Sequence, residues 1–184
     1  MRTRNAQDFL AFLARTRAGA RRRVREAVPA EVLERIDHAA RTDWIPVMEH
    51  GRFADAVLGV LGVDDMKSAS REFLVQALVK SPAILRLFEG VQRVFGVTVA
   101  GFVRVIPSVV AQSYKDAFKV VVERVGSEAL VVFEDIAPEL LKFDAYPVVW
   151  EGVLLGIYDL ASMAPQLDFK MQRGARRMEA RFRW

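Results

Sequence analysis

The C-terminal segment, residues 167–184, constrains the fold most, because apolar and polar side chains alternate along it up to the final residue. The alternation runs through residues 167–172, breaks around Gly174, and resumes through residues 177–184. A period of two places one apolar and one charged face on an antiparallel hairpin. Such a hairpin belongs to a sheet that is covered on one side only. We therefore predict that this segment forms two strands of an antiparallel sheet.

A second hairpin is predicted upstream, over about residues 118–133. Its first half alternates between apolar and charged side chains, Gly126 and Ser127 supply a turn, and residues 130–133 are rich in types that favour strands. Four antiparallel strands are thus expected from two hairpins.

The segment between the hairpins is predicted to be a buried helix. It opens at Asp144 and Pro147, runs to about Ser162, and is apolar on nearly all sides, which is typical of a helix inside a core. Gly152 and Gly156 would let it approach the sheet or another helix closely.

Helical spacing of apolar residues predicts that the rest of the chain is α-helical. Gly19 weakens the first helix, Gly51 interrupts the third, and Pro107 is expected to kink or restart the last. The predicted helices cover about residues 6–27, 29–41, 42–62, 65–80, 82–94 and 98–114. The fold class is therefore α+β, with N-terminal helices packed on a four-stranded antiparallel sheet made of two hairpins separated by a buried helix. We expect one domain, 1–184, mainly helical over 1–114, with hairpin, helix and hairpin over 115–184.

Composition excludes several classes of protein. A chain of 184 residues with 52% hydrophobic side chains suits one packed domain and is too apolar for a disordered chain. No secretion signal is visible, and no stretch reaches the ~20 apolar residues of a membrane span, so we expect a cytoplasmic protein. The chain has no cysteine and two histidines, which removes thiolate chemistry and leaves too few ligands for most histidine-based metal sites.

The titratable residues show no catalytic pattern. His38 follows Asp37, and His50 follows Glu49, but adjacent residues on a helix do not face each other. A structural role is therefore predicted for both histidines. The acidic pairs lack the alternating oxygen ligands and glycine turn of a calcium loop. We expect no enzymatic activity, no metal and no cofactor.

Charge is distributed unevenly along the chain. Residues 1–26 hold eight arginines and two acids, residues 27–167 have a net charge of −6, and the remainder has a net charge of +4. Such ends could hold the same chain together, pair two copies, or attract a polyanion. Solvated helix faces in an arginine-rich chain are the simpler interpretation. The candidate contacts for an anion or a partner are Arg21, Arg22, Arg23 and Arg25, although nucleic acid is disfavoured because no aromatic side chains are interleaved with them.

Two apolar segments could line a pocket in which a few polar groups orient a ligand. The candidate ligand-binding residues are Phe102, Arg104, Tyr114, Trp150 and Tyr158. Core packing accounts for the same residues more simply.

Several motifs also carry a family resemblance. The stretch from Trp150 to Tyr158 (WEGVLLGIY), the C-terminal RFRW, the segment from Phe53 to Gly62 and the Phe95-Gly96 step resemble an uncharacterised paralogous family of about this length in myxobacteria. The C-terminal plan is similar to 4-vinyl-reductase-type and haem-NO-binding-related sensor domains, and more distantly to small vesicle-tethering subunits. These folds enclose apolar ligands or act as dimeric platforms. The cysteines near the end of many vinyl-reductase-type domains are missing, and neither His38 nor His50 aligns with a haem ligand.

Two functions follow from this sequence. The main hypothesis is a non-enzymatic regulatory or protein-interaction module of a bacterial signalling or cellular-organisation system, with another protein or a second copy as partner. The alternative is a sensor domain that binds an apolar small molecule in an internal pocket. A homodimer is expected in either case, because many helices against one sheet leave apolar stripes to cover.

Overall fold

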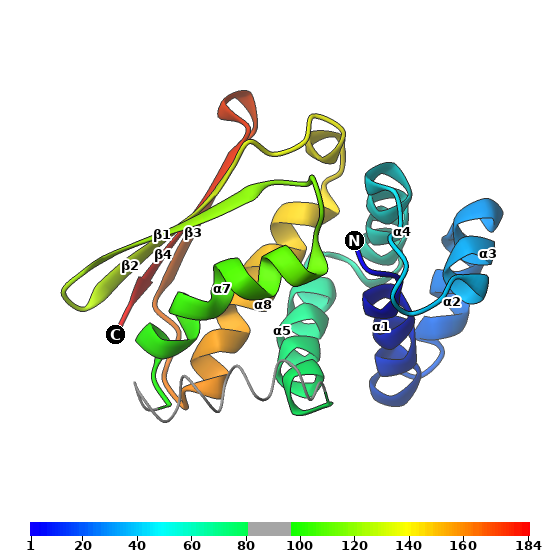
Figure 1. The fold of residues 1–184 in the computed structure, drawn as a ribbon. Helices are drawn as coiled ribbons and strands as arrows, with labels where there is room; N and C mark the ends of the chain where they lie inside the picture. Colours follow the sequence, from blue (N-terminus) through cyan, green and yellow to red (C-terminus); the bar gives the residue numbers. More distant parts are fainter. Residues whose placement is uncertain (81–96) are drawn as a thin grey trace.

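The computed structural model describes residues 1–80 and 97–184, which form an α+β fold (Figure 1). The N-terminal helices lie at one end of the molecule and the sheet at the other. The elements are α1 (Thr3–Thr16), α2 (Ala20–Ala27), α3 (Ala30–His38), α4 (Val47–Leu61), α5 (Val63–Lys80), α7 (Val99–Ser113), β1 (Lys119–Val125), β2 (Glu128–Glu134), a 3-10 turn (Leu140–Lys142), α8 (Ala145–Leu160), β3 (Leu167–Gln172) and β4 (Arg177–Arg183).

The sheet confirms the prediction from alternation. Its four strands are antiparallel in the order β1-β2-β4-β3, so the two hairpins join through β2 and β4. Phe133 pairs with Met178, and Val131 with Ala180, and these side chains are buried on the face covered by α7 and α8. The register therefore buries the apolar face that the sequence alternation requires.

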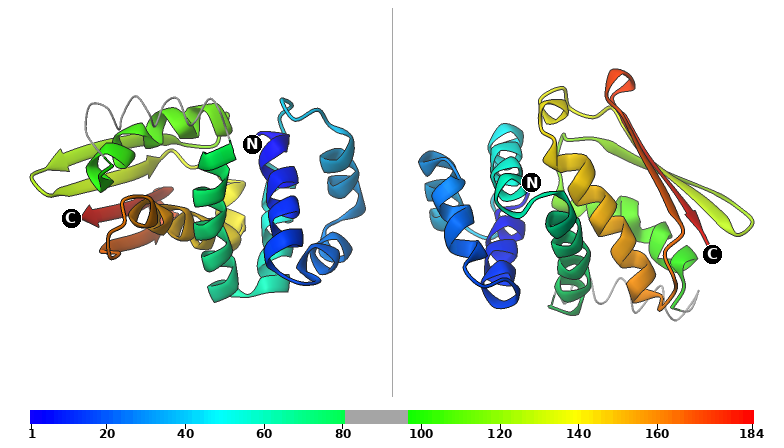
Figure 2. Two further views of the ribbon diagram at one scale, coloured as in Figure 1. Left: turned by 90° about the horizontal axis from the view of Figure 1, so that it is seen from below. Right: turned by 180° about the vertical axis from the view of Figure 1, so that it is seen from behind.

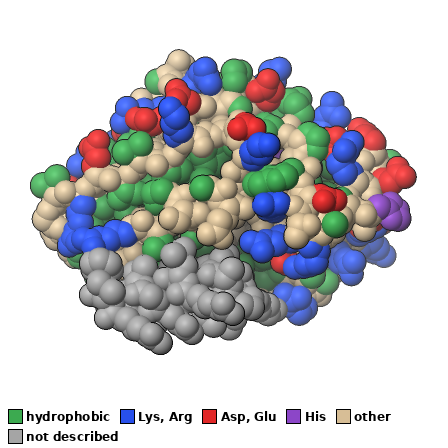
Figure 3. All heavy atoms as spheres, in the orientation of Figure 1, with side chains coloured by type: hydrophobic (Ala, Val, Ile, Leu, Met, Phe, Trp, Pro, Cys, Tyr) green, Lys and Arg blue, Asp and Glu red, His purple; other side chains and the backbone are tan. Residues whose placement is uncertain are grey.

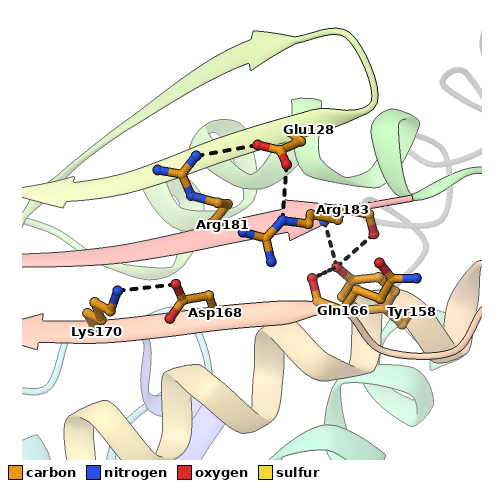
Figure 4. A network of polar contacts seen from close by, with 7 residues as sticks. All are labelled: Glu128, Tyr158, Gln166, Asp168, Lys170, Arg181 and Arg183. Atoms are coloured by element: carbon orange, nitrogen blue, oxygen red, sulfur yellow. Dashed lines mark hydrogen bonds and ion pairs between the residues drawn. The ribbon is translucent and has the colours of Figure 1, made fainter.

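The opposite face of the sheet carries ion pairs between neighbouring strands. Glu128 on β2 accepts hydrogen bonds from Arg181 at 3.3 Å and from Arg183 at 3.0 Å, both on β4 (Figure 4). Lys170 and Asp168 pair at 3.2 Å along β3. These exposed pairs keep the face polar, although each contributes at most about 1 kcal/mol to stability.

Two apolar cores meet at the contact between α5 and α8. One core lies between the sheet and the pair α7 and α8, and the other lies among α1 to α5. Gly152 and Gly156 on α8 lie against the backbone of Lys67 and Arg71 on α5. The two glycines therefore serve a helix–helix contact, one of the two options that the sequence left open. Figure 2 shows α5 and α8 side by side from two further directions.

The predicted helix over residues 6–27 is wrong as one element. It is two helices, because Gly19 has a φ of +72°, a left-handed conformation that glycine adopts without strain. The break lets Leu13 of α1 and Val24 of α2 both reach the N-terminal core.

The interruption expected at Gly51 is absent. The helix α4 continues through Gly51, where the missing side chain leaves room for the ring of Phe143. The helix α7 continues through Pro107 as one element, so the chain does not restart there, and a kink at this residue stays a prediction. The predicted helix over 82–94 and the Phe95-Gly96 step lie outside the described residues.

Candidate functional site

A cavity of about 210 Å³ lies where the two cores meet. Side chains of α1, α4, α5, α7 and α8 surround it. Its described lining is Met1, Asn5, Ala6, Phe9, His50, Phe53, Ala54, Val57, Met66, Ser70, Phe73, Leu74, Ala77, Phe102, Val105, Ile106, Val109, Val110, Ser113, Tyr114, Val149, Trp150, Val153, Leu154, Ile157 and Leu160. An engineered cavity of ~150 Å³ with such a lining binds benzene, so this cavity has room for a substituted single ring.

The lining is almost entirely apolar. Among the described residues around the cavity, none is Asp, Glu, Lys or Arg. The lining also includes Met1, whose amino group has a pKa lowered by burial to about 6 and is therefore mostly neutral at physiological pH. A bound ion would thus lose its hydration without gaining a charged side chain as partner in the described lining. The described part of the chain also contains no cluster of histidine and acidic residues able to hold a metal. The site thus favours a neutral ligand.

One part of the lining is polar and centres on His50 of α4. Its Nδ1 forms a hydrogen bond with the hydroxyl of Tyr146, at the start of α8 and 96 residues further along the chain. Burial lowers the pKa of His50 to about 3, so its imidazole is neutral at physiological pH. Burial also raises the pKa of the Tyr146 hydroxyl well above its ordinary value.

Tyr114, which follows α7, joins this group of aromatic side chains. Its ring packs against His50 with a centroid distance of 6.2 Å and against Trp150 at 5.4 Å. Burial raises the pKa of the Tyr114 hydroxyl, which has no hydrogen-bond partner among residues 1–80 and 97–184. On its other side Trp150 packs against Phe133 of β2 at 4.6 Å. The cavity wall is therefore continuous with the sheet core.

The start of α8 is held against α4 by a second polar contact. Asp55 of α4 accepts a hydrogen bond from the backbone nitrogen of Ala145 at 2.9 Å. This carboxylate meets one of the unpaired amides that begin any helix. The contact lies one residue before Tyr146, so it helps to fix the hydroxyl that His50 meets.

The structure brings three of the five predicted pocket residues together. Phe102, Tyr114 and Trp150 line the cavity, whereas Arg104 is exposed and Tyr158 lies elsewhere in the core. The Tyr158 hydroxyl donates to the carbonyl of Gln166 at 2.7 Å and accepts from the backbone nitrogen of Arg183 at 3.1 Å (Figure 4). Tyr158 therefore connects α8 to the second hairpin.

The four predicted anion contacts lie on or near α2, but they differ in environment. Arg25 forms two hydrogen bonds with Asp37 of α3, at 2.8 and 2.7 Å. The Nε of Arg22 lies 3.8 Å from the Oε1 of Glu26. Arg21 and Arg23 are exposed. Figure 3 shows basic side chains over the N-terminal helices with acidic ones interspersed. A role for these arginines in anion binding stays a prediction.

The contact between His50 and Tyr146 is not predictable from the sequence. The sequence predicts a structural role for His50 and gives no role for Tyr146, because neither residue belongs to a motif. The only available signal was a lone histidine on a helix that is otherwise apolar toward one side.

The fold has solved counterparts. An oxygen-binding H-NOX domain related to soluble guanylate cyclases, in its oxygen complex, superposes with a TM-score of 0.67 and 13% identity, covering 100% of this chain and 94% of that one. An Fe(II) unliganded H-NOX mutant from K. algicida gives 0.67 with 8% identity and 96% of that chain covered. A mutant of the T. tengcongensis H-NOX protein gives 0.63 with 12% identity and 97% covered. The chain therefore has the H-NOX fold.

The sequence comparisons do not assign this chain to a family. No family model matches the chain, and no curated protein matches it. The fold supports the resemblance to haem-NO-binding-related sensor domains, whereas the resemblance to the myxobacterial family stays a prediction. No helix in the described ranges is both long and apolar enough to cross a membrane.

The residues around the cavity do not fit a haem. Its two carboxylates would meet no arginine or lysine in the described lining, and a porphyrin is much larger than the substituted single ring that the cavity admits. His50 is the one histidine in the lining, and Tyr146 occupies its Nδ1, which leaves only Nε2 to reach a bound group. The misfit of haem therefore rests on the charge and size of the cavity.

Proposed function

We propose that this chain is a sensor domain of the H-NOX fold that binds an apolar small molecule and uses no haem. The apolar cavity, whose described lining holds no charged side chain, carries this proposal. Its lining comes from five helices on both sides of the contact between α5 and α8, so a ligand would touch both cores. The similarity to H-NOX structures supports the hypothesis of a small-molecule sensor more than the hypothesis of a protein-interaction module.

The proposal includes no catalytic step. The imidazole of His50 is neutral, and burial raises the pKa values of the two phenols. None of these three groups is poised to exchange a proton near pH 7, which general acid–base catalysis requires. Burial lowers the pKa of the Met1 amino group to about 6, and this amine donates a hydrogen bond to the carbonyl of Ile45 at 3.0 Å. The regulatory role, the homodimer and the cytoplasmic location expected from the sequence stay predictions.

Native mass spectrometry of the freshly purified chain tests this function directly. We expect the chain to carry a stoichiometric neutral compound, or to take up a small aromatic compound with a rise in melting temperature. A variant that fills the cavity, Val109→Trp, is expected to abolish the uptake. Val63→Trp provides the control, because Val63 is 53% exposed and lies outside the lining. Equal uptake by both variants would refute the proposal.

A further inference from the structure

Four polar groups around the cavity lack hydrogen-bond partners among the described residues. The Trp150 indole nitrogen and the Ser70 hydroxyl are fully buried and unpaired. The Tyr114 hydroxyl and the Nε2 of His50 also make no hydrogen bond within residues 1–80 and 97–184, although neither atom is among the fully buried unpaired groups. Native proteins leave few buried polar groups unpaired, and each one weakens the fold. Two such groups in the lining of one apolar cavity indicate that a bound molecule completes them in part.

His50 is the group best placed to meet such a molecule. Its side chain lines the cavity, whereas Tyr146, which occupies Nδ1, does not. The paired edge of the imidazole is therefore turned away from the cavity, and Nε2 is the atom left to contact a ligand. Tyr114 lines the same part of the cavity, with its ring edge-on to the imidazole.

The position of the imidazole proton follows from the groups left unpaired. If Nδ1 carried the proton, both the Tyr146 hydroxyl hydrogen and the Nε2 lone pair would lack partners in the described part of the chain. If Tyr146 donates to Nδ1, only the Nε2 hydrogen remains unpaired. Because an unpaired buried polar group is costly, we assign the second arrangement. His50 therefore presents a donor to the cavity.

The other unpaired groups are donors as well. An indole nitrogen only donates, and the hydroxyls of Tyr114 and Ser70 can donate. A carbonyl oxygen has two lone pairs and can accept from two donors at once. These donors could also meet a carboxylate, but the described lining has no arginine or lysine to balance its charge. A neutral carbonyl compound is therefore favoured.

We propose that the cavity binds a neutral, mostly apolar carbonyl compound whose oxygen accepts a hydrogen bond from Nε2 of His50, with the Tyr114 hydroxyl as a second donor and Tyr146 as the positioning residue. This inference rests on the proposed function, because it names the ligand class of the same cavity. It adds that the preference for a carbonyl compound over a hydrocarbon comes from the pair of His50 and Tyr146.

Three probes of similar size test the selectivity by calorimetric titration of the full chain: butyrophenone, butylbenzene and 4-phenylbutanoate. We expect butyrophenone to bind about tenfold more tightly than butylbenzene, because it alone makes the added hydrogen bond. The carboxylate is expected to bind at least about a hundredfold more weakly than the ketone, since its charge has no partner.

Variants then assign the selectivity to its residues. His50→Phe should bind the two neutral probes equally, and its retained affinity for butylbenzene shows that it is folded. Tyr146→Phe should reduce the preference for the ketone severalfold, because the imidazole proton is then free to move to Nδ1. Tyr158→Phe is the matched control, since it removes a hydroxyl from α8 away from the cavity and should keep the full preference.

Each outcome is decisive. Equal affinity of the unsubstituted chain for the ketone and the hydrocarbon would overturn the inference and leave the proposed function intact. A ketone preference that survives in His50→Phe, or tighter binding of the carboxylate, would also overturn it. Binding of none of the probes would overturn both this inference and the proposed function.

Discussion

Gly152 of α8 lies so close to the carbonyl oxygen of Lys67 on α5 that a Cβ atom at this position would overlap with it. The neighbouring contact, one turn further along α8, is similar: a Cβ on Gly156 would lie 2.9 Å from the carbonyl oxygen of Arg71. Two flanking ion pairs hold the same helices together, Lys67 with Glu151 at 2.9 Å and Arg71 with Asp159. The junction between the two cores therefore depends on the absence of two side chains.

Gly152→Ala is expected to destabilise the protein by roughly 1–3 kcal/mol, because the obstacle is backbone and cannot rotate away. Gly59→Ala on α4 is the matched control, since a Cβ there meets no atom within 4 Å. The control should be stabilised by about 0.5–1 kcal/mol through helix propensity. Urea denaturation of both variants measures the difference, and equal stabilities would contradict the close contact.

Tyr158→Phe should destabilise the protein by about 1–3 kcal/mol, because the hydroxyl joins α8 to two backbone groups of the second hairpin. Ligand affinity should not change, since Tyr158 does not line the cavity. Chemical denaturation and titration of one preparation test both statements. A large loss of affinity without a loss of stability would restore the binding role predicted from the sequence.

Phe182 tests the role of the last strand. It is fully buried on β4, and its ring stacks on Tyr158 with a centroid distance of 5.6 Å. Phe182→Ala should cost about 3–5 kcal/mol, a large part of the ~5–15 kcal/mol that stabilises a typical domain. Val125→Ala on β1, where the side chain is 81% exposed, should change stability by less than about 0.5 kcal/mol. Thermal melts that place both variants within a degree or two of the unsubstituted chain would show that the last strand is dispensable.

Titration with haemin tests whether this chain binds haem. We expect no stoichiometric complex when haemin is titrated into the purified protein, because the described lining offers no arginine or lysine to the carboxylates of haem. Absorbance spectroscopy should show only the broad bands of unbound haemin. A sharp Soret band at one equivalent that disappears in His50→Phe would refute this prediction and make His50 an iron ligand.

Much of the fold was predictable because it depends on local periodicity. Alternation located three of the strands and a run of strand-favouring residues located β2, while helical spacing located the described helical segments to within a few residues, except that residues 6–27 form two helices. The errors occurred at Gly19 and Gly51, where the same residue type has opposite consequences. Gly19 breaks a helix through its positive φ, whereas Gly51 lies inside a helix and leaves room for Phe143, which is distant in sequence. Such a contact leaves no periodic signal.

The candidate site was less predictable for the same reason. Phe102, Tyr114 and Trp150 were identified as aromatic residues in apolar segments, and they do line one cavity. The contact between His50 and Tyr146 spans 96 residues and depends on how α4 meets the start of α8. Only the tertiary structure shows that the imidazole is buried and that it has one free nitrogen.

The burial of His50 predicts how stability depends on pH. The pKa of His50 is about 3 in the folded protein, against ~6.5 in an unfolded chain. Above pH 6.5 both states hold a neutral imidazole, and its contribution to stability is fully present. As the pH falls below 6.5 the unfolded state takes up a proton and the folded state does not. The free energy of unfolding should therefore fall by about 1.4 kcal/mol per pH unit until pH approaches 3.

Urea denaturation between pH 7 and pH 4 measures this slope. Asp55 acts in the opposite direction near the acidic end, because burial raises its pKa and the folded state protonates it first. The comparison that isolates the imidazole is therefore between the unsubstituted chain and His50→Phe, whose stability should vary less steeply over this range. His38→Gln is the matched control, since His38 is exposed at the end of α3 and should leave the slope unchanged. If His38→Gln flattens the curve and His50→Phe does not, His50 is not the buried neutral histidine on which the ligand assignment depends.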